Sequence, residues 1–113
     1  MTDAAAEGRS RADEFLRLLT AGDDDAAGRL LAEVHEIRDL VFVGAGLTAV
    51  ARAEARGLPP AQRAQANTRQ LRLGILRDAN RDNHDGLRTW LRRAGEEIQL
   101  IRAQQAVADS IAG

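Results

Sequence analysis

The chain lacks cysteine, lysine and any apolar run long enough to cross a bilayer, and each absence narrows the class of protein. Because none of its 113 residues is cysteine, disulfides, thiolate metal sites and a cysteine nucleophile are excluded, which fits a reducing cytoplasm. The longest apolar run, Leu40 to Ala51, has 12 residues, whereas a membrane-spanning helix needs about 20. We therefore expect a cytoplasmic protein without a membrane partner.

Common catalytic and nucleotide-binding motifs are also missing. The sequence contains no Gly-x-Ser-x-Gly, no His-Glu-x-x-His and no Walker phosphate loop, so it gives no support to a hydrolase or a nucleoside triphosphatase. All 16 basic residues are arginine, as is typical of a GC-rich bacterial genome. Residues 1–58 carry a net charge of −4 and residues 59–113 one of +3. This asymmetry is too mild to predict nucleic acid as a partner.

The length and the first residues suggest how the chain is divided. A chain of 113 residues is long enough for one hydrophobic core and too short for two domains. Residues 1–9 carry acid early and have no apolar run, so they are not a signal peptide. We expect a flexible tail over residues 1–9 and a single helical domain over residues 10–113.

Hydrophobic spacing predicts a short helix followed by a long one. Ser10 and Asp13 have the spacing of a capping box, and apolar residues then recur at helical intervals as far as Gly22. Beyond it, apolar or small residues step by four and three without a slip, and Gly57 is a natural helix end. We predict one continuous helix over residues 26–56. The stepping residues are Leu30, Val34, Ile37, Val41, Gly44, Thr48, Ala51 and Ala55.

Two further helices complete the predicted fold. Pro60 suits a first helical position, and residues 60–79 place Ala64, Thr68, Leu71, Ile75 and Ala79 on one face, with Leu76 beside them. Residues 87–111 repeat the heptad spacing at Leu87, Leu91, Ala94, Ile98, Ile101, Gln105, Ala108 and Ala112. The sequence therefore predicts an all-α protein, an antiparallel bundle of one short and three longer helices with coiled-coil-like spacing.

One segment allows a second interpretation. Val41-Phe42-Val43 followed by Gly44-Ala45-Gly46-Leu47-Thr48-Ala49 resembles the strand and G-x-G-x-x-G/A turn of a dinucleotide-binding fold. The resemblance implies that Gly44, Gly46 and Ala49 would approach a pyrophosphate. The region after Gly57 is rich in proline and glutamine and is no second strand. Because the heptad passes through the glycines in phase, the pattern favours a helix here.

Arg77 and His84 form another candidate pair. Six residues separate them, which resembles the R-x(4–6)-H signature of HEPN ribonucleases, a family of four-helix domains of similar size. The resemblance implies that His84 would act as acid and base while Arg77 would steady the phosphate charge. The placement in a turn and the absence of a following tyrosine depart from the usual pattern.

Three groups of residues resemble metal ligands, and each has a structural explanation that we prefer. Asp23 to Asp25 are suited to capping the following helix. Asp78, Asn80 and Asp82 match the first spacings of a calcium loop, but glycine and the bidentate glutamate are missing from it. His35 and Asp39 lack the Glu-x-x-His pattern of a di-iron site. We expect neither a metal nor a cofactor.

The apolar segment between Leu40 and Val50 carries the prediction of a partner. Its two adjacent apolar stripes cover most of the helix circumference, and a four-helix monomer would leave part of them wet. We therefore expect a homo-oligomer, most simply a dimer, or else contact with another protein. The predicted interface residues are Val41, Phe42, Gly44, Leu47, Thr48 and Trp90.

These patterns together favour a non-catalytic protein. The sequence predicts a small bacterial or phage-related scaffold or regulatory protein that acts through helix-to-helix contacts. A HEPN-like ribonuclease that uses Arg77 and His84 is the main alternative. A nucleotide binder through residues 44–49 is the second alternative.

Overall fold

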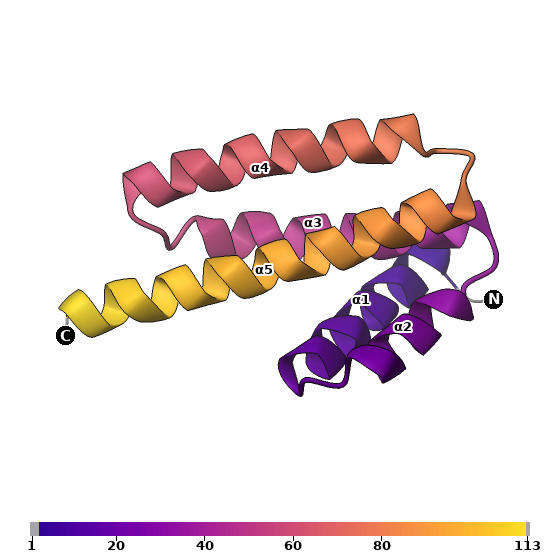
Figure 1. Cartoon of the computed structure of the whole chain (residues 1–113), viewed down its shortest axis with the longest axis horizontal. Coiled ribbons are helices and arrows are strands. Elements are labelled where there is room, and N and C mark those ends of the chain that lie inside the picture. Colours follow the sequence, from indigo (N-terminus) through magenta and orange to yellow (C-terminus); the bar gives the residue numbers. More distant parts are fainter. Residues whose placement is uncertain (1–2, 113) are drawn as a thin grey trace.

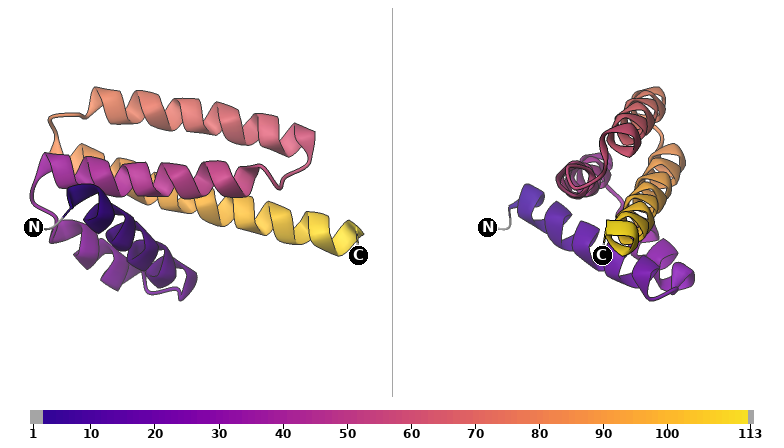
Figure 2. Two further views of the ribbon diagram at one scale, coloured as in Figure 1. Left: turned by 180° about the vertical axis from the view of Figure 1, so that it is seen from behind. Right: turned by 90° about the vertical axis from the view of Figure 1, so that its left-hand side faces the viewer.

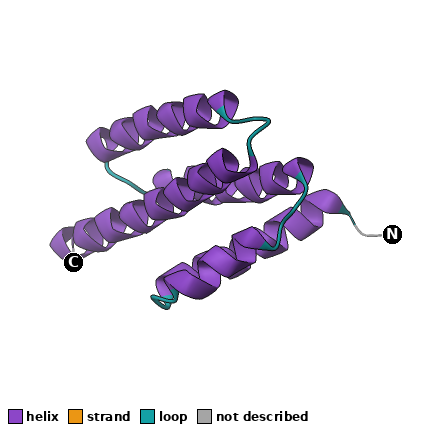
Figure 3. Cartoon of the chain, turned by 45° about the vertical axis from the view of Figure 1, so that its right-hand side comes forward, coloured by secondary structure: helices purple, strands orange, loops and turns teal. Residues whose placement is uncertain are grey.

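A computed structural model describes residues 3–112 as five α-helices, with no strand in that range (Figures 1 and 3). The all-helical prediction is therefore confirmed, although one helix more is present than was expected. The helices are α1 (Ala4–Thr20), α2 (Asp24–Ala32), α3 (Ile37–Ala55), α4 (Pro60–Ala79) and α5 (His84–Ala112). Within these residues no helix combines the length and the apolar character needed to span a bilayer.

The central element is α3, which packs between α1 and α5. The hairpin of α1 and α2 covers one side of α3, and α4 lies on the far side, against α5 and more lightly against α3 (Figures 1 and 2). Because α4 runs back along the outside, α3 and α5 run in the same direction (Figure 1). Helix α4 is antiparallel to both, and the hairpin of α1 and α2 crosses α3 obliquely (Figures 1 and 2).

The prediction of one continuous helix over residues 26–56 is wrong, since α2 ends at Ala32 and α3 begins at Ile37. The last carbonyl groups of a helix need partners from outside it, and here α5 supplies them. Arg88 donates its Nη2 to the carbonyl of Val34 at 2.9 Å and its Nε to that of Leu31 at 3.1 Å. These contacts join residues 54 and 57 positions apart, so the local heptad spacing carries no trace of them.

The helix start predicted at Ser10 is also wrong. Helix α1 begins at Ala4, and the Asp3 carboxylate caps it by accepting from the Ala5 amide at 3.0 Å. Residues 4–9 of the predicted tail are thus helical, while residues 1 and 2 lie outside the described residues. Gly8 explains the difference, because a Cβ there would lie 2.7 Å from the backbone of Phe42. This close crossing with α3 stabilises a turn of helix that has few apolar side chains of its own.

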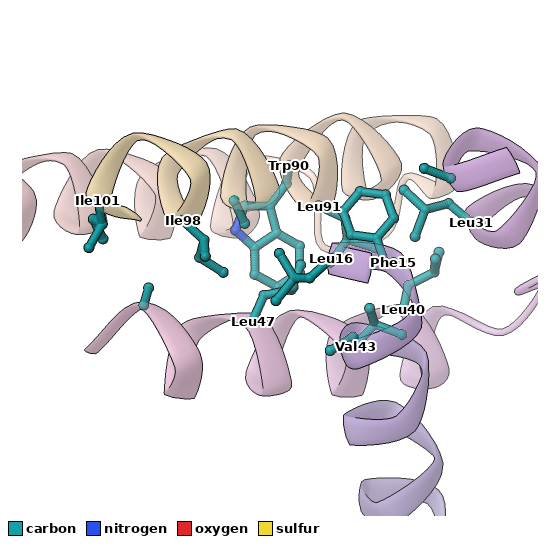
Figure 4. Close-up of a cluster of buried hydrophobic side chains, with 14 of the residues drawn as sticks. Phe15, Leu16, Leu31, Leu40, Val43, Leu47, Trp90, Leu91, Ile98 and Ile101 are labelled. Atoms are coloured by element: carbon teal, nitrogen blue, oxygen red, sulfur yellow. The ribbon is translucent and has the colours of Figure 1, made fainter. Parts of the chain in front are cut away.

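The core is built around α3, on the two sides that face α1 and α5. Leu40, Val43 and Leu47 are fully buried against side chains of the neighbouring helices (Figure 4). Gly44 faces Trp90 of α5, whose indole ring fills the space that a side chain would need. The neighbouring side chains in this cluster include Phe15, Leu16, Leu31, Leu91, Ile98 and Ile101. A single chain therefore provides a middle helix, and most of the apolar segment is buried without a second copy.

Helix α4 has the predicted boundaries, but its predicted inner face points outward. Leu71 is 72% exposed and Ile75 is 70% exposed, and the rest of that predicted face, Ala64, Thr68 and Ala79, is exposed as well. The residues that pack towards the core are Ala66, Leu73 and Leu76. Because α4 has two large aliphatic residues on each face, its hydrophobic spacing does not define which face is buried.

Helix α5 begins at His84, three residues before the expected start, and its predicted core row is buried as far as Ile101. Beyond this point α5 extends past the end of α3 (Figure 1). Val107 is 59% exposed and Ile111 is 82% exposed there. The heptad spacing therefore continues for about three turns past the last buried residue of the row, Ile101.

Replacing Gly44 by alanine should destabilise the fold, because the added methyl group overlaps the ring of Trp90. Overpacking of this kind costs about 1–3 kcal/mol. Gly28→Ala in α2 is the matched control, since nothing lies within 4 Å of the added Cβ, and it should be neutral or stabilise the fold by up to about 1 kcal/mol. Urea unfolding followed by circular dichroism measures both changes, and equal midpoints would contradict the packing of α3 on α5.

Replacing Arg88 by methionine should also destabilise the fold. The variant keeps an aliphatic stem but removes the Arg88 donor from the carbonyl of Val34 and one of two donors from that of Leu31, which still accepts from the Val34 amide, at a cost of about 1–3 kcal/mol. Arg81→Met removes an exposed arginine with no hydrogen bond to residues 3–112, so its unfolding midpoint should stay at the wild-type value. If the unfolding midpoint fell equally in Arg88→Met and Arg81→Met, the loss of stability would come from the change in net charge and not from the α2–α3 turn.

Candidate functional site

Two surface depressions flank α4, which is the least buried long helix of the chain. Of its 20 residues only Ala66 is buried. One depression, the α4–α5 cleft, has a volume of about 680 Å³. The other, the α3–α4 groove, consists of two hollows of about 310 and 290 Å³ that share Thr48, Arg52, Arg77 and Trp90.

Small residues of α3 line one wall of the α3–α4 groove. Val41, Ala45, Thr48 and Ala49 lie there at helical spacing, with Arg52 at the end. Trp90 lies at the base and is only 3% exposed. Across the groove, Gly74 lies between the exposed side chains of Leu71 and Ile75 on α4. The result is a shallow groove of mixed lining, with small residues on the α3 wall and Arg52, Arg77 and Asp78 around it, beside an apolar ridge formed by Leu71 and Ile75.

The structure divides the predicted interface residues into two groups. Val41, Thr48 and Trp90 line the α3–α4 groove together. Gly44 and Leu47 are buried inside the bundle, and Phe42 is partly covered where its backbone meets Gly8. The second group is therefore occupied by contacts within the chain.

The α4–α5 cleft contains a buried ion pair that sequence analysis did not find. Arg69 of α4 donates Nε to both carboxylate oxygens of Glu97 on α5, at 2.7 and 2.8 Å, and Nη2 reaches Gln104 at 3.5 Å. Glu97 is only 6% exposed and is the one buried charged residue among residues 3–112. Glu97 stands directly before Ile98 of the predicted core row, and this position indicates that the carboxylate could be buried. The sequence does not identify its partner, because Arg69 lies 28 residues away.

A second arginine–glutamate pair joins α3 to α5. Arg102 donates Nε and Nη2 to the two carboxylate oxygens of Glu54 at 2.8 and 3.0 Å. This hydrogen bonding raises the pKa of Arg102 above its ordinary value. The pair lies outside both depressions and ties together the ends of two core helices.

The strand that a dinucleotide site requires is absent from residues 3–112. Val41 to Val43 lie in α3, and Gly44 lies two turns after the start of that helix at Ile37. Its backbone is therefore inside the helix and not at an open N-terminus where a pyrophosphate could bind. Gly44 and Gly46 instead allow close packing against Trp90 and Ala12.

Arg77 and His84 do not meet in either depression. Arg77 lines the α3–α4 groove and donates to Asp78 at 3.0 Å. His84 is the first residue of α5, and its Nε2 lies 2.8 Å from the carbonyl oxygen of His35. The contact of His84 supports the α2–α3 turn, as that of Arg88 does.

The candidate metal ligands are used as helix and turn caps. Asp23 accepts from the amide of Ala26 at 3.1 Å, as predicted for a helix cap. Asn80 donates its side-chain amide to the carbonyl of Leu76 at 2.8 Å. Across residues 3–112, no three His, Asp or Glu side chains are grouped so that they could hold a metal ion.

No family model matches the chain, and neither a curated protein nor a solved structure matches it. The function therefore has to be inferred from the two depressions and the side chains that line them.

We expect no RNA cleavage that depends on His84, because its ring is bonded to a backbone carbonyl and lacks a nearby partner carboxylate to orient it. Wild-type protein and His84→Ala, freshly purified in parallel, should leave a labelled single-stranded RNA equally intact over hours. Cleavage by the wild type that disappears in His84→Ala, but persists in Arg81→Met, would instead support a nuclease.

Proposed function

We propose that the protein acts without catalysis, through helix-to-helix contacts made by the outer faces of α3 and α4, and that its simplest partner is a second copy of itself. The observation that supports this most strongly is the pair Leu71 and Ile75. They lie one helical turn apart and are 72% and 70% exposed beside the α3–α4 groove. Apolar side chains grouped in this way are typical of an interaction surface.

The free energy favours covering this ridge. Burying a leucine or isoleucine side chain contributes about 1.5–3 kcal/mol, so the two residues represent a substantial part of the stability of a small domain. The outward faces of α3 and α4 are each about 30 Å long and together offer on the order of 600 Å². This area approaches the roughly 800 Å² per partner of a standard interface.

The shape of the surface favours a second copy as the partner. The ridge of Leu71 and Ile75 adjoins a channel whose α3 wall is made of small residues such as Ala45 and Ala49. In a two-fold arrangement, the ridge of each copy would lie in the channel of the other. Such a contact uses the same surface twice, which is the commonest way in which soluble chains form closed oligomers. Val41 and Thr48 of the interface expected from the sequence belong to this surface.

Leu71→Glu and Ile75→Glu should each weaken self-association at least tenfold, because each replaces an apolar side chain of the ridge by a carboxylate that must lose its hydration when the ridge is covered. Both sites are exposed in the single chain, so the fold should be retained. Sedimentation velocity from about 1 to 200 μM measures the effect, with circular dichroism as a check of folding. Ile111→Glu is the matched control, since Ile111 is equally apolar and 82% exposed but lies at the end of α5.

Three outcomes would contradict this assignment. A wild-type protein that stays monomeric over the whole concentration range would exclude self-association. Dissociation by Ile111→Glu but not by Leu71→Glu would move the interface to the end of α5. An equal effect of all three substitutions would point to nonspecific association.

A further inference from the structure

The α4–α5 cleft concentrates positive charge in a chain that is slightly acidic overall. Four arginines and two glutamates line it, which gives the cleft a formal charge of +2 against −1 for the whole chain. These residues are Arg69 and Arg72 on α4 and Arg92, Arg93, Glu96 and Glu97 on α5. Positive groups held together between two helices repel one another, and a bound anion would relieve this repulsion.

Most of this charge is not neutralised within the chain. Glu97 pairs with Arg69, but Arg72, Arg92 and Arg93 form no ion pair with any of residues 3–112. Several other arginines, such as Arg17, Arg88 and Arg102, do have an acidic partner within 4 Å. The cleft thus brings together three guanidinium groups that form no ion pair, with Glu96 as the one further carboxylate beside them.

The buried pair of Arg69 and Glu97 gives the cleft a fixed wall. Glu97 accepts both of its hydrogen bonds from the Nε of Arg69, which leaves Nη1 of that guanidinium without a partner among residues 3–112. Because the pair is held by packing, Arg69 is orientated before any ligand arrives. A positioned guanidinium binds a phosphate or carboxylate oxygen with less loss of side-chain entropy than a free one.

We propose that the α4–α5 cleft is a binding site for a small ligand that carries at least two anionic groups, phosphate or carboxylate. Arginine forks match the paired oxygens of both groups. A volume of about 680 Å³ lies within the usual range for small-molecule sites. Leu73, Leu76 and Leu100 also line the cleft, so the body of the ligand can be apolar.

The same features argue against a long polyanion. Glu96 lies in the cleft with no arginine within ion-pair distance, and it would repel a continuous phosphate backbone. The chain as a whole has a formal charge of −1, so it lacks the strong net positive charge that is typical of proteins that bind nucleic acid. The site lies on the opposite flank of α4 from the α3–α4 groove, and it does not require self-association.

Calorimetric titration of the full chain with inorganic pyrophosphate and, separately, with citrate tests the proposal at low ionic strength. Exposed Arg92 and Arg93 can be replaced without touching the core. The double variant Arg92→Gln with Arg93→Gln should weaken binding of the preferred anion about tenfold or more. Arg56→Gln with Arg81→Gln is the control, because it removes the same charge from two exposed positions outside the cleft and should stay within about twofold of wild type.

Binding of pyrophosphate alone would identify phosphate as the recognised group, and binding of citrate alone would identify carboxylate. Either result supports the site if binding is weakened in the Arg92→Gln, Arg93→Gln variant and not in the control. Failure of both anions to bind saturably would overturn the proposal. Equal losses in the two double variants would do so as well, since they would reflect net charge. A protein that binds single-stranded RNA but neither small anion would also exclude the site proposed here.

Discussion

Burial of α3 on two sides is the constraint on which the rest of this structure depends. The segment is too apolar to lie at the surface, and it is covered because α1 and α5 both approach it closely. Glycines permit that approach at Gly8, Gly44 and Gly46, where an added Cβ would meet Phe42, Trp90 and Ala12 respectively. The residues that resemble a phosphate-binding turn thus serve to bring helices together.

The sequence was most informative where hydrophobic spacing was dense and least informative where distant side chains decide the outcome. It predicted the helical class, the boundaries of α4 at Pro60 and Ala79, and the buried row of α5 as far as Ile101. It did not predict the break between α2 and α3, because Arg88 makes the turn possible from more than 50 residues away. Of the predicted interface residues, Val41 and Thr48 of α3 and Trp90 of α5 line the α3–α4 groove, and their role as an interface stays a prediction, whereas the pair of Arg69 and Glu97 has no local signature.

Helix α4 shows why one helix can border two different surfaces. It contributes little to the core, since its aliphatic residues are shared between two faces. The inner pair, Leu73 and Leu76, attaches it to the bundle together with Arg69. The outer pair, Leu71 and Ile75, is exposed in the single chain. Because α4 is packed so lightly, its arginines line the two depressions beside it: Arg69 and Arg72 line the α4–α5 cleft, and Arg77 lines the α3–α4 groove.

The contacts of His84 and Arg88 also have a consequence for how the chain matures during synthesis. These two residues support the turn between α2 and α3, yet they leave the ribosome only after some 50 further residues have been made. Helices α1 to α3 therefore emerge before the groups that complete their turn exist. Until the last helix has been made, the side of α3 that α5 covers has no cover from α5, and the turn between α2 and α3 lacks its side-chain donors.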